Sequence, residues 1–270
     1  MEYIDAYNGE KIPRFIYKYF PLNNDCYNSI LKNYLWFSDP LTFNDPYDCN
    51  LSFNMDFTAE DFRNYLIFKR EYYESIGISD YSKVDIQKKV TEFETTPQKI
   101  KTFIDSENKK WIRDNYGVTC FSANYDNILM WSHYSDKHKG ICIGFDLIQD
   151  FEFFKYAYNV KYPEVYPTVN LIKDRMDRKT SLIQFQLATK SLDWQYENEV
   201  RLIRSKNLVD VYRGAVEFKK KSAFRVYFGY KVDTETISRL KDLFVCLDYN
   251  VDFYRLDLKN LEFGLVPTEI

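Results

Sequence analysis

Histidine is nearly absent from this sequence. The 270 residues include two histidines, His133 and His138, and both lie in the stretch MWSHYSDKHKG. Together with Cys120 they copy the spacing of the second half of a zinc finger, but the cysteine pair that should come first is missing. Two histidines at this spacing on a helix also point about 140° away from each other. We therefore expect no metal site, and we expect both histidines to border a ligand pocket as turn-forming and hydrogen-bonding residues.

The chain also lacks paired cysteines, long apolar runs and an excess of basic charge. Its five cysteines are widely spaced without a CxxC motif, which favours free thiols in a reducing compartment. The first residues, MEYIDAYNGEKIPRF, are too charged for a secretion signal, and no apolar run approaches the roughly 20 residues that span a bilayer. We expect a cytoplasmic protein without membrane contact. The net charge of −3 also excludes a global field that would attract a polyanion.

Strand-like and helical segments alternate irregularly, and this pattern predicts an α+β fold. Short segments rich in aromatic and β-branched residues, such as RFIYKYFP, GICIGFD and FRVYFGYKV, predict strands. Residues 58–115 show helical spacing instead, and Thr58 with Asp61 has the spacing of a capping box. We predict one domain over residues 1–270 with a helical insertion at 58–115. Regular βαβ alternation and the motif GxGxxG are missing, which argues against a doubly wound nucleotide-binding fold.

Acidic residues gather in the segment DWQYENEVRLIR. Its alternation predicts a strand on which Glu197, Glu199 and Arg201 project to one side. Three charged side chains on one face are costly to bury, so they face either solvent or a polar cleft. Such a cleft would suit a sugar whose anomeric carbon becomes positively charged. An exposed edge strand with cross-strand ion pairs explains the same pattern, and the sequence leaves both interpretations open.

His133 lies between two aromatic residues, Trp131 and Tyr134, just before the polar turn SDKHKG. In that position a histidine could hydrogen-bond a phosphate or a ribose hydroxyl, or orient a carboxylate. A buried histidine that satisfies a backbone carbonyl would have the same neighbours, so this alternative also stays open. The polar residues of YLWFSDPLTFNDPYD have a simpler explanation, because Asn and Asp side chains build turns through bonds to the backbone.

Several motifs resemble those of a bacterial family that is catalogued only as a domain of unknown function. The motifs of that family are a YKY strand, LWFSxPxxFNDPYD, CFSxxxxxxxMWSHYxxxHxGxCIxFD and WxYExEVRL. This chain matches them at Tyr17–Tyr19, Leu35–Asp48, Cys120–Asp146 and Trp194–Leu202. The matches span most of the chain outside the helical insertion. They imply membership of that family, which brings no settled activity with it.

The order of residues along the predicted strands also resembles the ADP-ribosyltransferase fold, whose enzymes carry a catalytic glutamate on a late strand, often as Glu-x-Glu. The corresponding residues here are Lys18 and Tyr19, then Phe37 and Ser38, then Glu197-Asn198-Glu199. The chain departs from the pattern because its first strand has no histidine. In this chain His133 or Lys18 would bind NAD instead. The resemblance implies an α+β fold with a mixed or antiparallel split sheet.

The same resemblance implies roles for individual residues, with NAD as the substrate. The nicotinamide ribose would lie near Ser38 and Tyr19. Glu199 would bind the ribose 2′-hydroxyl and stabilise the oxocarbenium-like charge, and Glu197 would help to activate the acceptor. Arg201 or His133 would hold the pyrophosphate. The implied NAD-binding residues are Lys18, Tyr19, Ser38, Asn44, Trp131, His133 and Arg201.

Such an enzyme would modify a protein or a nucleic acid as a toxin-like or phage-defence effector, with a partner protein or antitoxin. Two other functions stay open. One is a nucleotide-sensing module without catalysis, in which Trp131, His133 and Arg201 grip the ligand. The other is a metal-dependent nuclease that uses acidic residues of two segments: Asp45, Asp48, Glu197 and Glu199.

Overall fold

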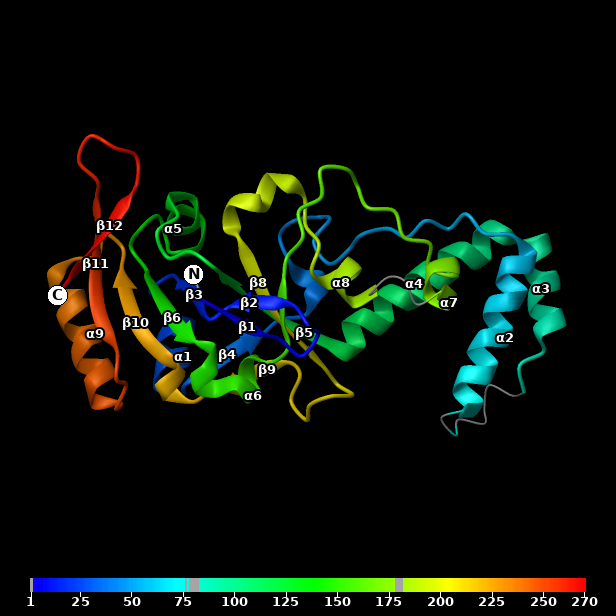
Figure 1. The fold of residues 1–270 in the computed structure, drawn as a ribbon, viewed down its shortest axis with the longest axis horizontal. Coiled ribbons are helices and arrows are strands. Elements are labelled where there is room, and N and C mark those ends of the chain that lie inside the picture. The colour runs from blue at the N-terminus through cyan, green and yellow to red at the C-terminus, as the bar shows by residue number, and fades with distance from the viewer. Residues whose placement is uncertain (1, 76, 78–82, 178–181) are drawn as a thin grey trace.

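An eight-stranded mixed sheet forms the centre of the molecule (Figure 1), in a computed structural model that describes residues 2–75, 77, 83–177 and 182–270. The strand order is β12-β11-β10-β6-β3-β5-β8-β7. Strands β10 and β11 pair in parallel, and the other neighbours pair antiparallel. The predicted α+β class is confirmed. In chain order the strands are β3 (Phe15–Phe20), β5 (Tyr116–Ser122), β6 (Ile141–Asp146), β7 (Ala157–Asn159), β8 (Glu199–Ser205), β10 (Ala223–Phe228), β11 (Asp252–Leu258) and β12 (Leu265–Glu269).

Strands β3 and β5, at the middle of this sheet, barely touch. Their register consists of one residue pair, Tyr17 with Ser122, whereas β3 pairs with β6 and β5 pairs with β8 along their full lengths. Lys18 reaches across the junction, and its Nζ donates to the carbonyl oxygen of Cys120 at 2.8 Å. The two strands therefore diverge, and side chains of both face the space between them.

Two short antiparallel pairs flank the large sheet. Strands β1 (Tyr3–Asp5) and β2 (Lys11–Pro13) form one pair, and β4 (Tyr34–Phe37) and β9 (Gly214–Glu217) form the other. Directly after β4, Ser38 makes a backbone bridge to Val118 of β5. This bridge brings the turn-rich segment after β4 to the junction where β3 and β5 separate.

Successive strand residues point to opposite sides of the sheet, so both of its faces carry apolar side chains. Helices cover both faces. On one face, α1 (Asn24–Leu31) and α9 (Thr234–Cys246) bury apolar residues against a large core. On the other, α5 (Ile128–Tyr134) packs Met130 and Trp131 among the tyrosines of β3 and β10. Trp131 is fully buried, and its indole N–H donates to the Tyr125 carbonyl oxygen at 2.7 Å. None of the described helices has the length and apolar character needed to cross a bilayer.

Side-chain caps fix where these helices begin. The Asn23 side chain accepts from the Cys26 backbone N–H at the start of α1. Asn127 accepts from two backbone N–H groups at the start of α5. The Asp233 side chain accepts from the Thr236 backbone N–H at the start of α9. The caps satisfy amide groups that have no partner in the first turn of a helix.

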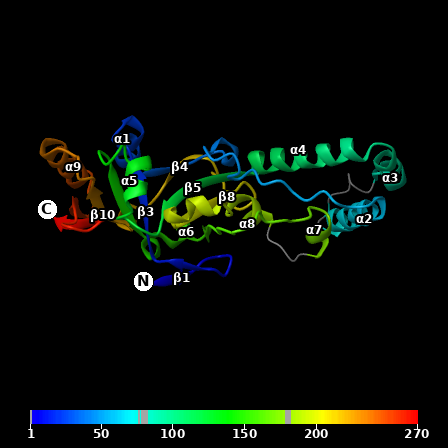
Figure 2. The ribbon, with the colours of Figure 1, turned by 90° about the horizontal axis from the view of Figure 1, so that it is seen from above.

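Three helices occupy most of the stretch 58–115: α2 (Ala59–Ser75), α3 (Ile86–Thr95) and α4 (Pro97–Asn115). They lie at the opposite end of the molecule from α9, with α4 running back toward β5 (Figures 1 and 2). The predicted capping box is present, since Thr58 and Asp61 exchange hydrogen bonds. The region has its own apolar cluster around Phe57 and Phe93, whose rings stack at 5.4 Å. Three short helices complete the described α-helices: α6 (Phe151–Phe154), α7 (Lys173–Asp177) and α8 (Leu182–Leu187).

The predicted strand across Glu197 is wrong at its start. Glu197 is the last residue of a 3₁₀-helix, η4 (Leu192–Glu197), and β8 begins two residues later at Glu199. Between them Asn198 adopts a left-handed conformation with φ of 43°, which Asn tolerates better than most residues. The turn breaks the alternation, so the direction of Glu197 is set by η4 and not by the pleat of the strand.

We expect Gly140→Ala to destabilise the protein by about 3 kcal/mol, because an added Cβ would lie 2.1 Å from the Phe20 carbonyl oxygen and force the backbone apart. Gly9→Ala is the control: its Cβ would meet nothing within 4 Å, and its φ of +79° costs about 1 kcal/mol. Urea denaturation of both variants measures the difference. Equal losses would contradict the tight approach of β3 to Gly140.

Candidate functional site

A cavity of about 230 Å³ opens where β3 and β5 diverge. Aromatic side chains form much of its wall, and charged side chains gather at one end. The lining residues come from β3, from β4 and the segment that follows it, from β5, from α5 and from the region around η4: Tyr17, Lys18, Tyr19, Trp36, Ser38, Phe43, Asn44, Asp48, Val118, Thr119, Cys120, Phe121, Ser122, Met130, Tyr134, Lys190, Glu197 and Glu199.

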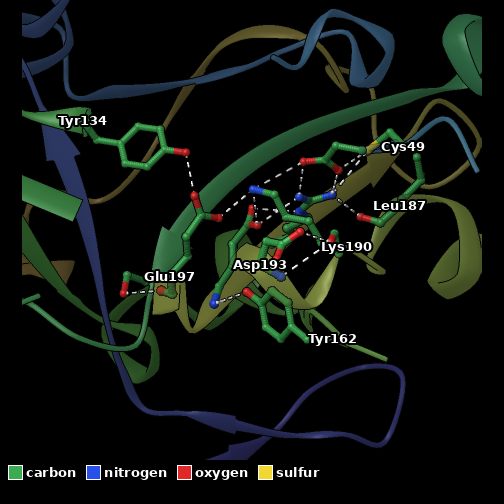
Figure 3. Close-up of polar contacts among 12 residues, drawn as sticks. Cys49, Tyr134, Tyr162, Leu187, Lys190, Asp193 and Glu197 are labelled. Carbon is green, nitrogen blue, oxygen red and sulfur yellow. Dashed lines mark hydrogen bonds and ion pairs between the residues drawn. The ribbon is translucent and has the colours of Figure 1, made fainter. Parts of the chain in front are cut away.

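The charged end of the cavity is a buried ion cluster of three carboxylates and two cations (Figure 3). Each side chain is between 0% and 5% exposed. Burying charged groups is costly unless they are paired and hydrogen-bonded. The cluster therefore depends on its internal contacts, and its members are Asp48, Lys190, Glu197, Glu199 and Arg201.

Arg201 holds two of the carboxylates through paired hydrogen bonds. Its Nη1 and Nη2 donate to the two oxygens of Asp48, both at 2.7 Å. Its Nε and Nη2 donate to Glu199 at 2.7 and 2.9 Å. Nη1 also donates to the Leu187 carbonyl oxygen at 2.9 Å. The planar guanidinium suits such two-sided bidentate bonding, and it joins β8 to the segment after β4.

Glu197 is held from two sides. Lys190 Nζ donates to one carboxylate oxygen at 2.6 Å, and Tyr134 Oη donates to the other, also at 2.6 Å. Lys190 lies 3.6 Å from Asp48 and 3.7 Å from Glu199 as well. The Trp194 ring covers the ammonium group with its centroid at 4.5 Å. Glu197 is therefore directed to the cavity wall by α5 and by the segment after α8.

The pKa values of the two glutamates are shifted in opposite directions. Burial and the charge of Glu199 raise the pKa of Glu197, and its hydrogen bonds from Lys190 and Tyr134 offset only part of this effect. Burial alone would raise the pKa of Glu199 too, but the charge and hydrogen bonds of Arg201, aided by Lys190, lower it to about 2. Glu199 is thus a permanent anion near neutral pH, while Glu197 is the better candidate to accept and release a proton.

The ion cluster carries a net charge of −1 when Glu197 is ionised, since three carboxylates face two cations. Lys18 lies across the cavity, and burial lowers its pKa although Glu199 opposes the shift. A negative field in a partly enclosed cavity stabilises positive charge on a ligand. Protonation of Glu197 would remove that field.

Four of the predicted NAD-binding residues lie at the cavity wall: Lys18, Tyr19, Ser38 and Asn44. The predicted catalytic pair, Glu197 and Glu199, lies there too. Three predicted binding residues do not. Trp131 is fully buried behind Tyr19, Arg201 is fully buried behind Glu199, and His133 is exposed outside the lining. Trp131 and Arg201 thus position side chains that line the cavity.

The two histidines have separate environments. The ring of His133 lies 6.4 Å from that of Tyr196 at the surface. His138 is buried in a turn where it and the two preceding residues all have positive φ. Its Nε2 lies 3.1 Å from Ser132 Oγ, and its ring stacks parallel to Trp131. Burial and nearby Lys231 lower the pKa of His138. His138 stabilises the turn after α5 and does not line the cavity.

Among the described residues, no group of three or more His, Cys, Asp or Glu side chains is arranged to hold a metal ion. Asp48, Glu197 and Glu199 are near one another, but Lys190 and Arg201 occupy the space between their oxygens. The two cations take the place that a divalent ion would need. This arrangement gives no support to the nuclease alternative, and its fourth residue, Asp45, does not line the cavity.

Sequence reasoning missed Lys190 and Tyr134 as members of the site. Lys190 lies in QLATKSLDW, where nothing distinguishes it from a solvent-exposed lysine. The sequence shows Tyr134 only as a neighbour of His133. It offers Asp48 as a turn residue or as a member of the nuclease alternative, and the repeated aspartates of FNDPYD are the available signal. The partners of Tyr134 and Asp48 are distant in sequence. Lys190 lies only seven residues before Glu197, but no local pattern shows that the two side chains meet.

The family comparison matches one segment of the chain and gives no activity. Residues 130–202 match the model of a domain of unknown function. The description of that family is "Protein of unknown function (DUF2971)". The match includes Tyr134 and four members of the ion cluster, Lys190, Glu197, Glu199 and Arg201, and excludes Asp48 and all of β3. No curated protein and no solved structure matches the chain.

Arg201→Lys should destabilise the protein by about 3–5 kcal/mol, because one ammonium cannot replace the two bidentate contacts and leaves a carboxylate unpaired. Arg239→Lys is the control, since its side chain is 69% exposed. Urea unfolding followed by tryptophan fluorescence measures both. If the two variants unfold at the same urea concentration, Arg201 does not hold the cluster together.

His138→Phe should make the free energy of unfolding less dependent on pH. The pKa of His138 is lowered in the folded state, so folding favours the neutral ring. This contribution is complete above about pH 6.5, the pKa of a free histidine, and is lost as the pH falls. Between pH 7.5 and 5 the wild type should lose more unfolding free energy than His138→Phe. His133→Phe, at an exposed position, should keep the wild-type dependence; identical curves for all three proteins would refute the prediction.

Proposed function

We propose that this protein is an ADP-ribosyltransferase-like enzyme that transfers ADP-ribose from NAD to a protein or nucleic acid. The observation that carries the proposal is the position of a negative ion cluster at the end of an aromatic cavity, in the gap between two diverging strands. Glycosyl transfer from NAD creates positive charge at the anomeric carbon, and such a field stabilises it. The near-break between β3 and β5 supports a split sheet of the kind that the sequence resemblance implies.

The size and lining of the cavity support one end of NAD as the occupant. Its volume of about 230 Å³ is just below the usual range for a complete ligand pocket, about 300–1,000 Å³. The nicotinamide ring and its ribose would enter, among Tyr17, Tyr19 and Phe43, and the rest of the molecule would extend along the opening. Lys18, Ser38 and Asn44 supply polar groups at this wall.

The chemistry assigns different tasks to the two glutamates. The bond between the ribose C1′ and the nicotinamide nitrogen breaks, its electron pair leaves with nicotinamide, and C1′ becomes oxocarbenium-like. Glu199, which is always ionised near neutral pH, stabilises that charge. The nucleophile of the acceptor forms the new bond to C1′ and gives its proton to Glu197. Arg201 and Tyr134 hold the two carboxylates in place.

Electrostatic stabilisation and proton transfer contribute differently to the rate. Groups pre-organised around a developing charge typically contribute about 3–4 kcal/mol each. A well-placed general base contributes about 10²–10⁴-fold. Both effects need Glu197 ionised, because its protonation removes the net negative charge of the cluster. The rate should therefore fall as the pH drops through the raised pKa of Glu197.

A nucleotide-sensing module without catalysis is the second candidate function. It is favoured by one observation, which is that both oxygens of Glu197 already accept hydrogen bonds, from Lys190 and Tyr134. A carboxylate held in this way can serve binding alone. Under this alternative NAD or another nucleotide would bind the cavity and leave unchanged.

Incubation of the wild type with NAD labelled in the adenylate and in the nicotinamide, with cell lysate as acceptor, tests the proposal. We expect release of nicotinamide and transfer of the adenylate label. Glu197→Gln and Glu199→Gln should each lower the rate by about 100-fold or more. Glu235→Gln, on the exposed surface of α9, should match the wild type.

The wild-type rate should also rise with pH above about 4.3, the pKa of a free glutamate, because the pKa of Glu197 is raised. Absence of nicotinamide release and of label transfer in the wild type would exclude the enzyme. Calorimetric binding of a nucleotide without turnover would then support the sensing module.

A further inference from the structure

A second hollow, of about 490 Å³, has its own set of lining residues, separate from those of the cavity. Residues of β8, α6 and β9 and the residues that follow β9 contribute to its wall. We propose that this hollow binds a phosphate group, which the buried guanidinium of Arg204 and the ammonium of Lys220 hold together. The site would bind phosphate whether or not the protein consumes NAD.

Arg204 is a buried arginine to which the described part of the chain supplies no carboxylate partner. It is 9% exposed, and its guanidinium carbon lies 5.1 Å from the ring centroids of both Phe37 and Phe153. Its Nη1 donates to the Val211 carbonyl oxygen at 2.9 Å, whereas its Nε is buried without a hydrogen-bond partner. Buried donors are nearly always paired, and a guanidinium has five N–H groups to offer an oxyanion. Arg204 therefore has donors for an acceptor from outside the chain.

Arg201, three residues earlier on β8, has the charge compensation that Arg204 lacks. The two side chains point to opposite faces of the sheet, because residues alternate along a strand. Burial would lower the pKa of Arg201, but neighbouring charges, led by that of Glu199, raise it well above its usual value. Burial lowers the pKa of Arg204, and Tyr156 and Asp150 offset only part of this effect. An anion in the hollow would supply the missing compensation.

The acidic residues of the hollow are either paired or exposed. Asp150 accepts from the Lys219 backbone N–H at 2.8 Å, and the Nζ of the same lysine lies 3.6 Å away. Glu152 is paired with Lys155 at 2.6 Å. Glu217 is exposed on β9, where water and salt screen its charge. These carboxylates therefore cancel little of the charge of the buried guanidinium.

Lys220 gives the hollow a second cation. Its Nζ donates to the Leu247 carbonyl oxygen at 2.7 Å and lies 5.5 Å from the centroid of the Tyr249 ring. Like Arg204, it forms no ion pair with a carboxylate of the described residues. Two such cations favour a doubly charged anion. A phosphate group carries about −1.5 to −2 charges at neutral pH, whereas a carboxylate carries one, and the volume of the hollow is within the usual range for a small-molecule pocket.

Calorimetry without NAD, in chloride buffer at constant ionic strength and neutral pH, tests this site. The probes are inorganic phosphate, glycerol 3-phosphate and acetate, which carries a single charge. We expect a Kd for phosphate below about 1 mM and at least about tenfold weaker binding of acetate. Tighter binding of glycerol 3-phosphate than of inorganic phosphate would identify the ligand as a phosphate ester, and the reverse order would identify it as the free ion.

Variants of the two cations locate the binding. Arg204→Met keeps an apolar side chain between the two phenylalanine rings and should weaken phosphate binding by at least about tenfold. Lys220→Met, at a partly exposed position, should fold like the wild type and weaken phosphate binding by several-fold. Arg239→Met is the matched control, since that arginine is 69% exposed on α9, and it should bind phosphate like the wild type.

Three results would overturn the proposal: no binding of phosphate up to about 10 mM, equal affinities for phosphate and acetate, or an unchanged affinity for phosphate in the variants of Arg204 and Lys220. Should Arg204→Met fail to fold, Lys220→Met and the comparison with acetate decide the question. Because these measurements contain no NAD, binding of phosphate stands even if ADP-ribose is never transferred. Its absence would remove this site and leave the proposed function intact.

Discussion

The buried guanidinium of Arg201 is the contact on which the candidate site depends. It lies between Asp48 and Glu199 and bonds to both oxygens of each. Asp48 follows β4, whereas Glu199 begins β8, so this one side chain joins segments about 150 residues apart in sequence. Since each unpaired buried charge would cost several kcal/mol, the pairs exist together or not at all. The end of the cavity is therefore fixed by charge balance as much as by the strands.

The same charge balance explains why two adjacent glutamates behave differently. Glu199 is on the strand, where the pleat directs it to Arg201, and its pKa falls to about 2. Glu197 ends a 3₁₀-helix, and the left-handed turn at Asn198 aims it toward Lys190 and Tyr134. On a continuous strand, both carboxylates would have pointed to the same side, toward Arg201. The turn divides them into a fixed charge and a titratable group, which is the division that acid–base work requires.

The features that could be predicted from the sequence are those that depend on residues close together in the chain. Strand and helix patterns, the cap at Asn23 and the box at Thr58 depend on neighbours in sequence, and the structure has them. The interpretation of Glu197 as a strand residue was wrong because Glu-Asn-Glu fits a pleat as well as a turn, and only the contacts made by η4 decide. Lys190 could not be found, because only the fold shows that its side chain is buried with the nearby Glu197 and Glu199 and with the distant Asp48.

The extent of the family match bears on what the site needs. Residues 130–202 contain both glutamates, Lys190 and Arg201, but Arg201 without Asp48 would be a buried cation facing a single carboxylate and a lysine. The segment after β4 and strand β3 lie outside the match, yet they supply Asp48 and one wall of the cavity. The matched segment therefore cannot form the site alone. Whatever reaction or ligand the cavity serves, its chemistry belongs to the sheet as a whole, because the balancing charge and the aromatic wall come from the first third of the chain.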